Sequence, residues 1–138
     1  MATFGIYTNS GLTTAFTGSI TASQNSDGST GAQDFNLFIG STASGKTLQA
    51  DSNPGVDQIA LSISDAASGS GHPATDIKLA LLQSSLSGAT AGASLNLGTS
   101  ILSGAGNSKS FWIRITDSTH VVGTSTELSI TTNLLRES

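Results

Sequence analysis

The chain has 138 residues, of which 36% are hydrophobic and only 10% are charged, and its formal net charge at pH 7 is −4. This length suits one domain with a single core, and the five scattered Lys and Arg residues argue against a nucleic-acid partner, which would require clustered cations. The absence of Cys excludes disulfides, thiolate metal sites and a thiol nucleophile.

Membrane and export signals are missing from the sequence. No run approaches the roughly 18 apolar residues of a membrane span, and residues 1–7 lack the basic and apolar regions of a secretory leader. We therefore expect no membrane partner and a protein that is used where it is made.

The first 33 residues are polar, with isolated apolar side chains among Thr, Ser, Asn and Gly. Short strands are expected at 4–7 and 12–16, with a turn at 9–11 between them. Two interpretations stay open: a loosely attached first hairpin of the domain, or an arm that packs on another subunit, because so polar a segment buries little apolar surface of its own. In the second interpretation, the N-terminal residues that contact the partner are Phe4, Ile6, Tyr7 and Phe16.

Three strands are expected in the next part of the chain, at 34–40, 46–50 and 57–64. In the first, Phe35, Leu37 and Ile39 recur at every second position and so lie on one face, which is typical of a strand with one buried face. Asn53-Pro54-Gly55 is a strong turn signal between the second and third strands.

The segment 77–82 fits a strand, although its leucines also fit a helix face, and a single helical turn is expected at 83–86. Further short strands are expected at 93–97 and from 101, and 124–134 is expected to close the domain.

The strand expected at 111–117 is the most informative one, because it carries the only Trp of the chain. Phe111, Ile113 and Ile115 alternate with Trp112 and Arg114, so the two sets lie on opposite faces. Large aromatics are usually well buried, which favours Trp112 as a core residue over an exposed residue that stacks on a sugar. For Arg114 we expect a salt bridge or a partner contact.

These patterns predict an all-β fold: an antiparallel β-sandwich of seven or more short strands joined by Gly, Asn, Asp and Ser turns. The sandwich domain is expected to span 34–138, preceded by a loosely structured N-terminal arm at 1–33.

Segments 57–63, 111–117 and 127–131 resemble the immunoglobulin-like β-sandwiches found in virion proteins of tailed bacteriophages. In those proteins an aromatic and basic strand near the C-terminus is followed by an acidic turn and a final Thr-rich strand. The resemblance covers roughly residues 34–134 and lacks the usual sandwich disulfide. It implies a protein that decorates or cements a capsid, or a part of a tail.

Two kinds of reactive site were considered. His72 and His120 lie in separate loops with no Gly-x-Ser-x-Gly elbow, so we expect no catalytic residue, and His72 is interpreted as a loop residue with a local backbone contact. Calcium would need converging oxygen ligands, but no Asp-x-Asp-x-Asp-Gly loop exists, and Asp beside a turn ordinarily caps backbone amides. We therefore expect no metal and no cofactor. The carboxylates at expected strand ends are Asp51, Asp57, Asp65, Asp76 and Asp117.

Together, composition and resemblance lead us to expect a non-enzymatic structural virion protein, assembled in the host cytoplasm, that decorates or cements a phage head. Its partners would be the major capsid protein or other virion subunits, and we expect it to form a homo-oligomer on the particle. On the arm interpretation, a chain that lacks residues 2–33 would stay folded but attach poorly. The alternative is a carbohydrate-binding module of a tail or fibre.

Overall fold

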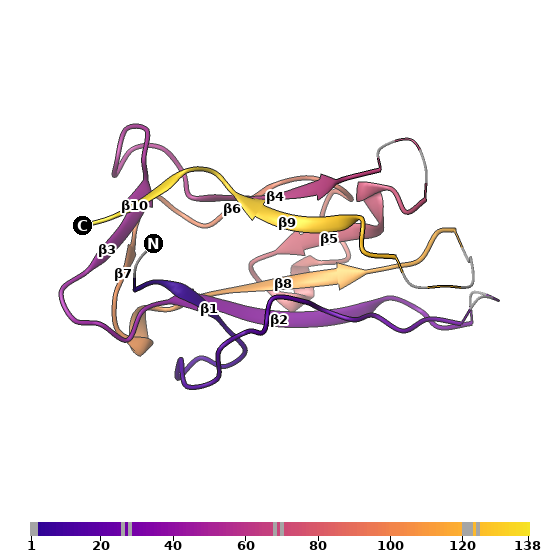
Figure 1. The fold of residues 1–138 in the computed structure, drawn as a ribbon, viewed down its shortest axis with the longest axis horizontal. Coiled ribbons are helices and arrows are strands. Elements are labelled where there is room, and N and C mark those ends of the chain that lie inside the picture. Colours follow the sequence, from indigo (N-terminus) through magenta and orange to yellow (C-terminus); the bar gives the residue numbers. More distant parts are fainter. Residues whose placement is uncertain are drawn as a thin grey trace.

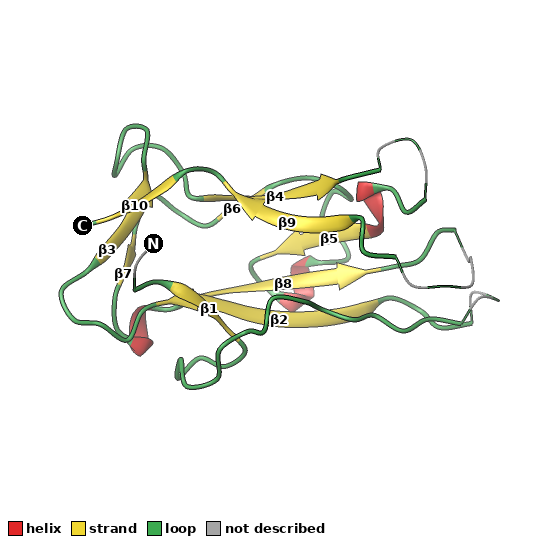
Figure 2. Cartoon of the chain, viewed as in Figure 1, coloured by secondary structure: helices red, strands yellow, loops and turns green. Residues whose placement is uncertain are grey.

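The computed structural model describes residues 3–25, 27, 29–67, 69, 71–119, 123 and 125–138. Within them lie ten short strands and three single 3₁₀ turns, and the fold is all-β with antiparallel pairing throughout these strands (Figure 2). The strands are β1 (Gly5–Tyr7), β2 (Gln33–Gly40), β3 (Thr47–Ala50), β4 (Ala60–Asp65), β5 (Ile77–Ala80), β6 (Leu95–Asn96), β7 (Ile101–Leu102), β8 (Lys109–Ile115), β9 (Leu128–Thr132) and β10 (Leu135–Glu137). The 3₁₀ turns are η1 (Ala74–Asp76), η2 (Gln83–Ser85) and η3 (Ala105–Asn107).

The first sheet has the strand order β1-β2-β8-β5, and its centre is the long pair β2 and β8. The register of this pair runs from Gln33 opposite Ile115 to Ile39 opposite Lys109. This register places Leu37 beside Phe111, so the buried residues Leu37, Ile39, Phe111 and Ile113 of the two strands lie on one face. The expected inward faces of these two strands are therefore confirmed.

The other two sheets, β10-β3-β7 and β6-β4-β9, continue each other. The last part of the chain pairs first with β4, where Thr132 lies opposite Leu61, and then with β3, where Leu135 lies opposite Ala50. β3 and β4 thus follow each other along one line, with residues 51–59 looping out between them. Figure 1 shows this layer above the sheet that contains β2 and β8.

The core fills the space between the layers and takes residues from every sheet. Ile39, Leu48 and Ile59 are fully buried, and Ile113 is 1% exposed. Each buried side chain of this size contributes about 1.5–3 kcal/mol through removal from water. The core residues are Phe4, Leu37, Ile39, Leu48, Ile59, Leu61, Ile77, Leu79, Leu97, Ile101, Phe111 and Ile113.

The N-terminal segment packs on its own chain. β1 pairs with β2 at the edge of the first sheet, and Phe4 belongs to the core with 5% of its surface exposed. Phe16 and Ile20 pack against the core from the same segment. The strand expected at 12–16 is reduced to one bridge between Tyr7 and Ala15. These contacts favour a first hairpin of the domain over a free arm.

The start of β4 and the division of the last strand differ from the expected boundaries for one shared reason. The last strand is divided at Asn133, whose side chain accepts a hydrogen bond from the Ala60 N–H at 3.0 Å and donates to the Gln58 carbonyl at 2.9 Å. These side-chain bonds replace backbone ladder bonds at the point where the C-terminal segment changes its pairing partner from β4 to β3. For this reason β4 begins only at Ala60, and β10 forms a separate strand. The helical turn expected after residue 82 is confirmed as η2.

No helix among the residues described here has the length and apolar character to cross a membrane.

The first described residues lie beside the C-terminal strand β10 at one end of the molecule (Figure 1), where the Glu137 carboxylate accepts three hydrogen bonds. The donors are the Thr3 N–H at 2.9 Å, the Thr3 hydroxyl at 2.8 Å and the Phe4 N–H at 3.3 Å.

Glu137→Gln is expected to lower the melting temperature at pH 7. Hydrogen bonds from the Thr3 backbone and side chain hold the pKa of the Glu137 carboxyl below its ordinary value of 4.5. A lowered folded-state pKa stabilises the protein above the unfolded value, and this stabilisation is lost as the pH falls through the folded value. Melting curves of both proteins between pH 7 and pH 3 should therefore converge in acid. A difference in melting temperature that stays constant across this range would show that the ionised Glu137 carboxylate does not stabilise the fold.

Candidate functional site

A cluster of one imidazole and two carboxylates lies at the end of the molecule opposite the chain termini. It is formed by His72, Asp76 and Asp117, which we call the His–Asp cluster. His72 and Asp76 come from the connection between β4 and β5, and Asp117 follows β8.

The pairing of β5 with β8 brings the two carboxylates together. Ile77 lies opposite Ile115, so Asp76, just before β5, comes close to Asp117, just after β8. The Asp76 carbonyl accepts the Thr116 N–H at 2.9 Å and the Thr116 hydroxyl at 3.2 Å. The backbone of both strands therefore fixes where these acids lie.

The polar atoms of the cluster converge on one ring nitrogen. His72 Nδ1 lies 3.1 Å from Asp76 Oδ2, 3.4 Å from Asp117 Oδ1 and 3.4 Å from the Thr119 hydroxyl oxygen. The side chains of His72, Asp76 and Asp117 are 23%, 3% and 15% exposed. The cluster is thus partly buried but reachable from solvent at the imidazole.

Neighbouring groups hold the cluster in place. The Ser118 hydroxyl donates to Asp76 Oδ1 at 2.6 Å, and Thr119 donates to Asp117 Oδ1 from its N–H and its hydroxyl, both at 2.9 Å. The backbone N–H of His72 donates to Glu127 Oε1. Gly71 lies beside this contact with a φ of +66°, which favours glycine, and an added Cβ would lie 2.5 Å from the Glu127 carboxylate and displace it.

This geometry is not that of a catalytic triad. In a triad, one imidazole nitrogen faces the nucleophile and the other faces the orienting acid. Here the hydroxyl of Thr119 and the carboxylate of Asp76 face the same nitrogen, Nδ1. No proton relay from hydroxyl to acid through the ring follows from this arrangement.

The cluster accounts for part of what the sequence suggested. Of the five acids considered as calcium ligands, the structure brings together Asp76 and Asp117, while Asp51 lies 3.6 Å from the Arg136 guanidinium. The Asp57 carboxylate accepts from the Ser52 hydroxyl, and Asp65 caps the Ala67 N–H, which is ordinary turn chemistry. The description of His72 as a residue with only a local contact missed its side chain's partners. His120 lies outside the described residues.

Arg114 forms the expected salt bridge within the chain. Its Nε and Nη2 donate to the two oxygens of Asp34 at 2.8 and 3.0 Å, across β8 and β2. The hydrogen bond from Arg114 holds the pKa of the Asp34 carboxyl below its ordinary range. Gln83 also donates to Asp34, at 3.2 Å, so η2 reaches over this face of the sheet.

The interpretation of Trp112 as a core residue is wrong. Trp112 shares the outer face of β8 with Arg114, is half-buried and does not belong to the core cluster. The inward positions on either side of it are filled by Phe111 and Ile113. The alternation that was used to separate the two faces was therefore a better guide than the general tendency of Trp to be buried.

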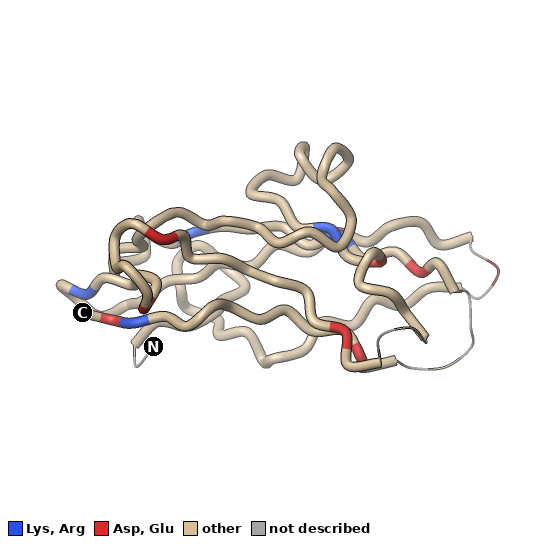
Figure 3. The backbone as a smooth tube through the Cα atoms, turned by 90° about the horizontal axis from the view of Figure 1, so that it is seen from above, with Lys and Arg blue, Asp and Glu red and all other residues tan. Residues whose placement is uncertain are grey.

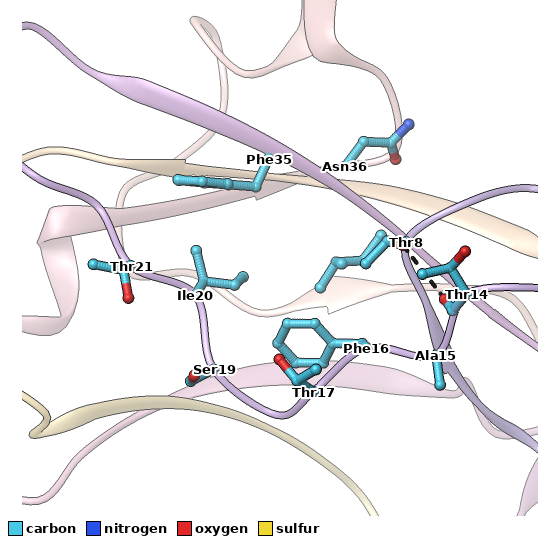
Figure 4. A pocket seen from close by; sticks show the side chains of 11 residues that line it. Thr8, Thr14, Ala15, Phe16, Thr17, Ser19, Ile20, Thr21, Phe35 and Asn36 are labelled. Atoms are coloured by element: carbon cyan, nitrogen blue, oxygen red, sulfur yellow. Dashed lines mark hydrogen bonds between the residues drawn. The ribbon is translucent and has the colours of Figure 1, made fainter.

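The N-terminal residues proposed as partner contacts lie close to the core of their own chain. Phe4 is buried in that core, which corrects its assignment, whereas Ile6, Tyr7 and Phe16 are half-buried. Phe16, Ile20 and Phe35 surround a shallow cavity of about 390 Å³ between the N-terminal segment and β2 (Figure 4). Its other labelled lining residues are Thr8, Thr14, Ala15, Thr17, Ser19, Thr21 and Asn36. The cavity carries no titratable side chain, so binding chemistry there is limited to hydroxyl, amide and apolar contacts.

Comparisons with family models, with curated proteins and with solved structures find no match for this chain. Its function must therefore be inferred from its own residues.

Proposed function

We propose that the chain is a structural virion protein of the decoration or cement type, which binds assembled shell subunits of a phage head. The observation that carries this proposal is an ion-poor, hydroxyl-rich double layer that exposes large aliphatic side chains at defined places. Charged residues make up only 10% of the chain, and Figure 3 shows them as a few short segments of a mostly uncharged backbone. Such a surface approaches another protein with little desolvation of charge.

The finer fold assignment belongs to the same proposal. The four-stranded sheet β1-β2-β8-β5 faces a layer that is three strands wide. In that layer the two smaller sheets join end to end, so that β4 continues β3, β7 continues β6 and β10 continues β9. A four-on-three antiparallel sandwich is the plan of immunoglobulin-like domains. This arrangement supports the resemblance to immunoglobulin-like virion proteins.

Exposed leucines suggest which surface attaches. Leu102 on β7 is 54% exposed and Leu134, just before β10, is 74% exposed. Their neighbours Ile101 and Leu135 pack in or against the core, so Leu102 and Leu134 point away from it. Val56, which is 73% exposed, lies in the loop after β3. Asp51 in the same loop donates its N–H to the Leu134 carbonyl. We propose this outer side of the β10-β3-β7 sheet as the contact with the shell.

The N-terminal segment has a different role in this proposal from the one expected. Its apolar residues stabilise the sandwich itself, because Phe4 is in the core and Phe16 packs against it. Attachment therefore does not depend on a free arm, although Tyr7 and Ile6 remain half-exposed at the sheet edge.

Binding to shells should fail when the proposed surface is made acidic. We expect the double variant Leu102→Asp/Leu134→Asp to bind particles at least about tenfold more weakly, because buried interface anchors cost more than about 1.4 kcal/mol when lost. The measurement is co-sedimentation with capsids of the encoding phage that were prepared without this protein. Both positions are exposed, so the fold should be retained.

Leu82→Asp is the matched control, since Leu82 is 62% exposed in the turn after β5. It should bind like the unmodified chain. If all variants bind equally, the surface is wrong, and if the unmodified chain binds no particle, the proposed function fails. Locating the subunit in an image of the intact virion would test the function without any variant.

A second candidate function is favoured by the position of Trp112. A half-buried Trp on an outer sheet face, opposite Asn36 and beside Ser110, resembles the aromatic and amide groups that bind sugars. Glycan-array binding that Trp112→Ala abolishes would favour a tail or fibre module over a decoration protein.

A further inference from the structure

The His–Asp cluster gathers three oxygens around one ring nitrogen. Nδ1 of His72 carries at most one hydrogen, but three oxygens lie within 3.4 Å of it. The Thr119 hydroxyl already donates to Asp117 at 2.9 Å, so its oxygen faces Nδ1 as a lone pair. The two carboxylate oxygens therefore compete for, or share, the one hydrogen that Nδ1 can carry.

The two separations from His72 Nδ1 match those between ligands of a metal ion. Bonds of about 2.0–2.1 Å in a tetrahedral site place neighbouring ligand atoms about 3.3 Å apart. The distances from Nδ1 to Asp76 Oδ2 and to Asp117 Oδ1 are 3.1 and 3.4 Å. All three ligand atoms lie within 4.8 Å of one another.

We propose that His72, Asp76 and Asp117 bind a divalent transition-metal ion, for which Zn²⁺ is the best match. One imidazole and two carboxylates supply three ligands, and the Thr119 hydroxyl or a water supplies the fourth. Calcium is a poorer match, because it prefers six to eight oxygen ligands and an imidazole is not one of them.

The burial of Asp76 supports a cation at this place. Its side chain is 3% exposed, and a buried carboxylate is costly unless a positive charge or a metal accompanies it. Asp76 forms an ion pair with His72, which carries a charge only when it is protonated. A metal ion would compensate the carboxylate while His72 stays neutral.

The surroundings provide the support that metal ligands need. The Ser118 hydroxyl orients Asp76 through Oδ1, while Oδ2 faces His72 and also accepts the Ser118 backbone N–H at 3.5 Å. Thr119 orients Asp117, and Glu127 holds the backbone of His72. Such outer contacts typically change metal affinity by about 10–100-fold when removed.

Calorimetric titration with ZnCl₂ tests the site on the full chain, without a histidine tag and after treatment with a chelator. We expect one Zn²⁺ per chain, a rise in melting temperature with metal, and a shift of the His72 ring resonances in NMR spectra. His72→Gln and Asp117→Asn should each weaken binding by about 100-fold or more, and Ser118→Ala, which removes only a positioning contact, by about tenfold.

Asp57→Asn is the matched control, because it removes one carboxylate from the loop between β3 and β4, outside the cluster. It should bind Zn²⁺ like the unmodified chain, and circular dichroism should show that every variant is folded. Absence of Zn²⁺ binding, or equal binding by His72→Gln, would overturn the proposal. Binding of Ca²⁺ in preference to Zn²⁺ would overturn the assignment of the imidazole as a ligand. None of these outcomes depends on attachment to a particle.

Discussion

Phe111→Ala should lower the free energy of unfolding by about 3–5 kcal/mol, the usual cost of removing a buried Phe side chain. Phe111 is 2% exposed and lies in β8, between β2 and β5, where Leu37 is its partner across the strands. The cavity left behind would border both layers, since the core there contains residues from each sheet. Urea denaturation followed by Trp112 fluorescence measures the change.

Phe38→Ala is the matched control for this experiment. Phe38 lies opposite Ser110 in the same pair of strands, but it points to the outer face and is only half-buried. Its loss should cost clearly less than that of Phe111. Equal costs for the two variants would show that the faces of β2 and β8 have been assigned incorrectly.

Removal of residues 1–32 should leave a chain that no longer unfolds cooperatively at room temperature. The truncation deletes β1, exposes the edge of β2 and removes Phe4 from the core together with Phe16 and Ile20 beside it. Phe4→Ala alone should cost about 3–5 kcal/mol, and domains of this size are stable by only about 5–15 kcal/mol. Near-ultraviolet circular dichroism and urea denaturation measure the loss.

Thr17→Ala, at an exposed position of the same segment, should change stability by less than about 0.5 kcal/mol. A truncated chain with the denaturation curve of the full chain would instead restore the interpretation of a detachable arm. The result also decides how attachment experiments can be designed, because an unfolded truncation says nothing about binding.

Local patterns were reliable where burial is decided within one strand. Leu37 and Ile39 in β2, and Phe111 and Ile113 in β8, recur at every second position. This spacing predicted the buried faces of both strands, because neighbouring side chains of a strand must point to opposite sides. The local patterns were less reliable at the ends of strands. The division between β9 and β10 depends on Asn133 and its bonds to residues more than 70 positions away.

The N-terminal segment shows a second limit. Phe4 is an isolated apolar residue among polar neighbours, so no local pattern predicts that it is buried. Its burial results from the pairing of β1 with β2, which gives a polar segment access to a core formed by the rest of the chain.

By itself, the sequence determined the all-β class, the inward faces of the longer strands and the scarcity of charge, because these depend on composition and on period-two alternation. Only the tertiary structure decided that Trp112 lies on an outer face beside the Arg114–Asp34 ion pair, and that His72, Asp76 and Asp117 meet. The reason is that His72 and Asp117 are distant in the chain and become neighbours only through the register of β5 against β8. A register of this kind is set by packing over the whole sheet, and single residues do not reveal it.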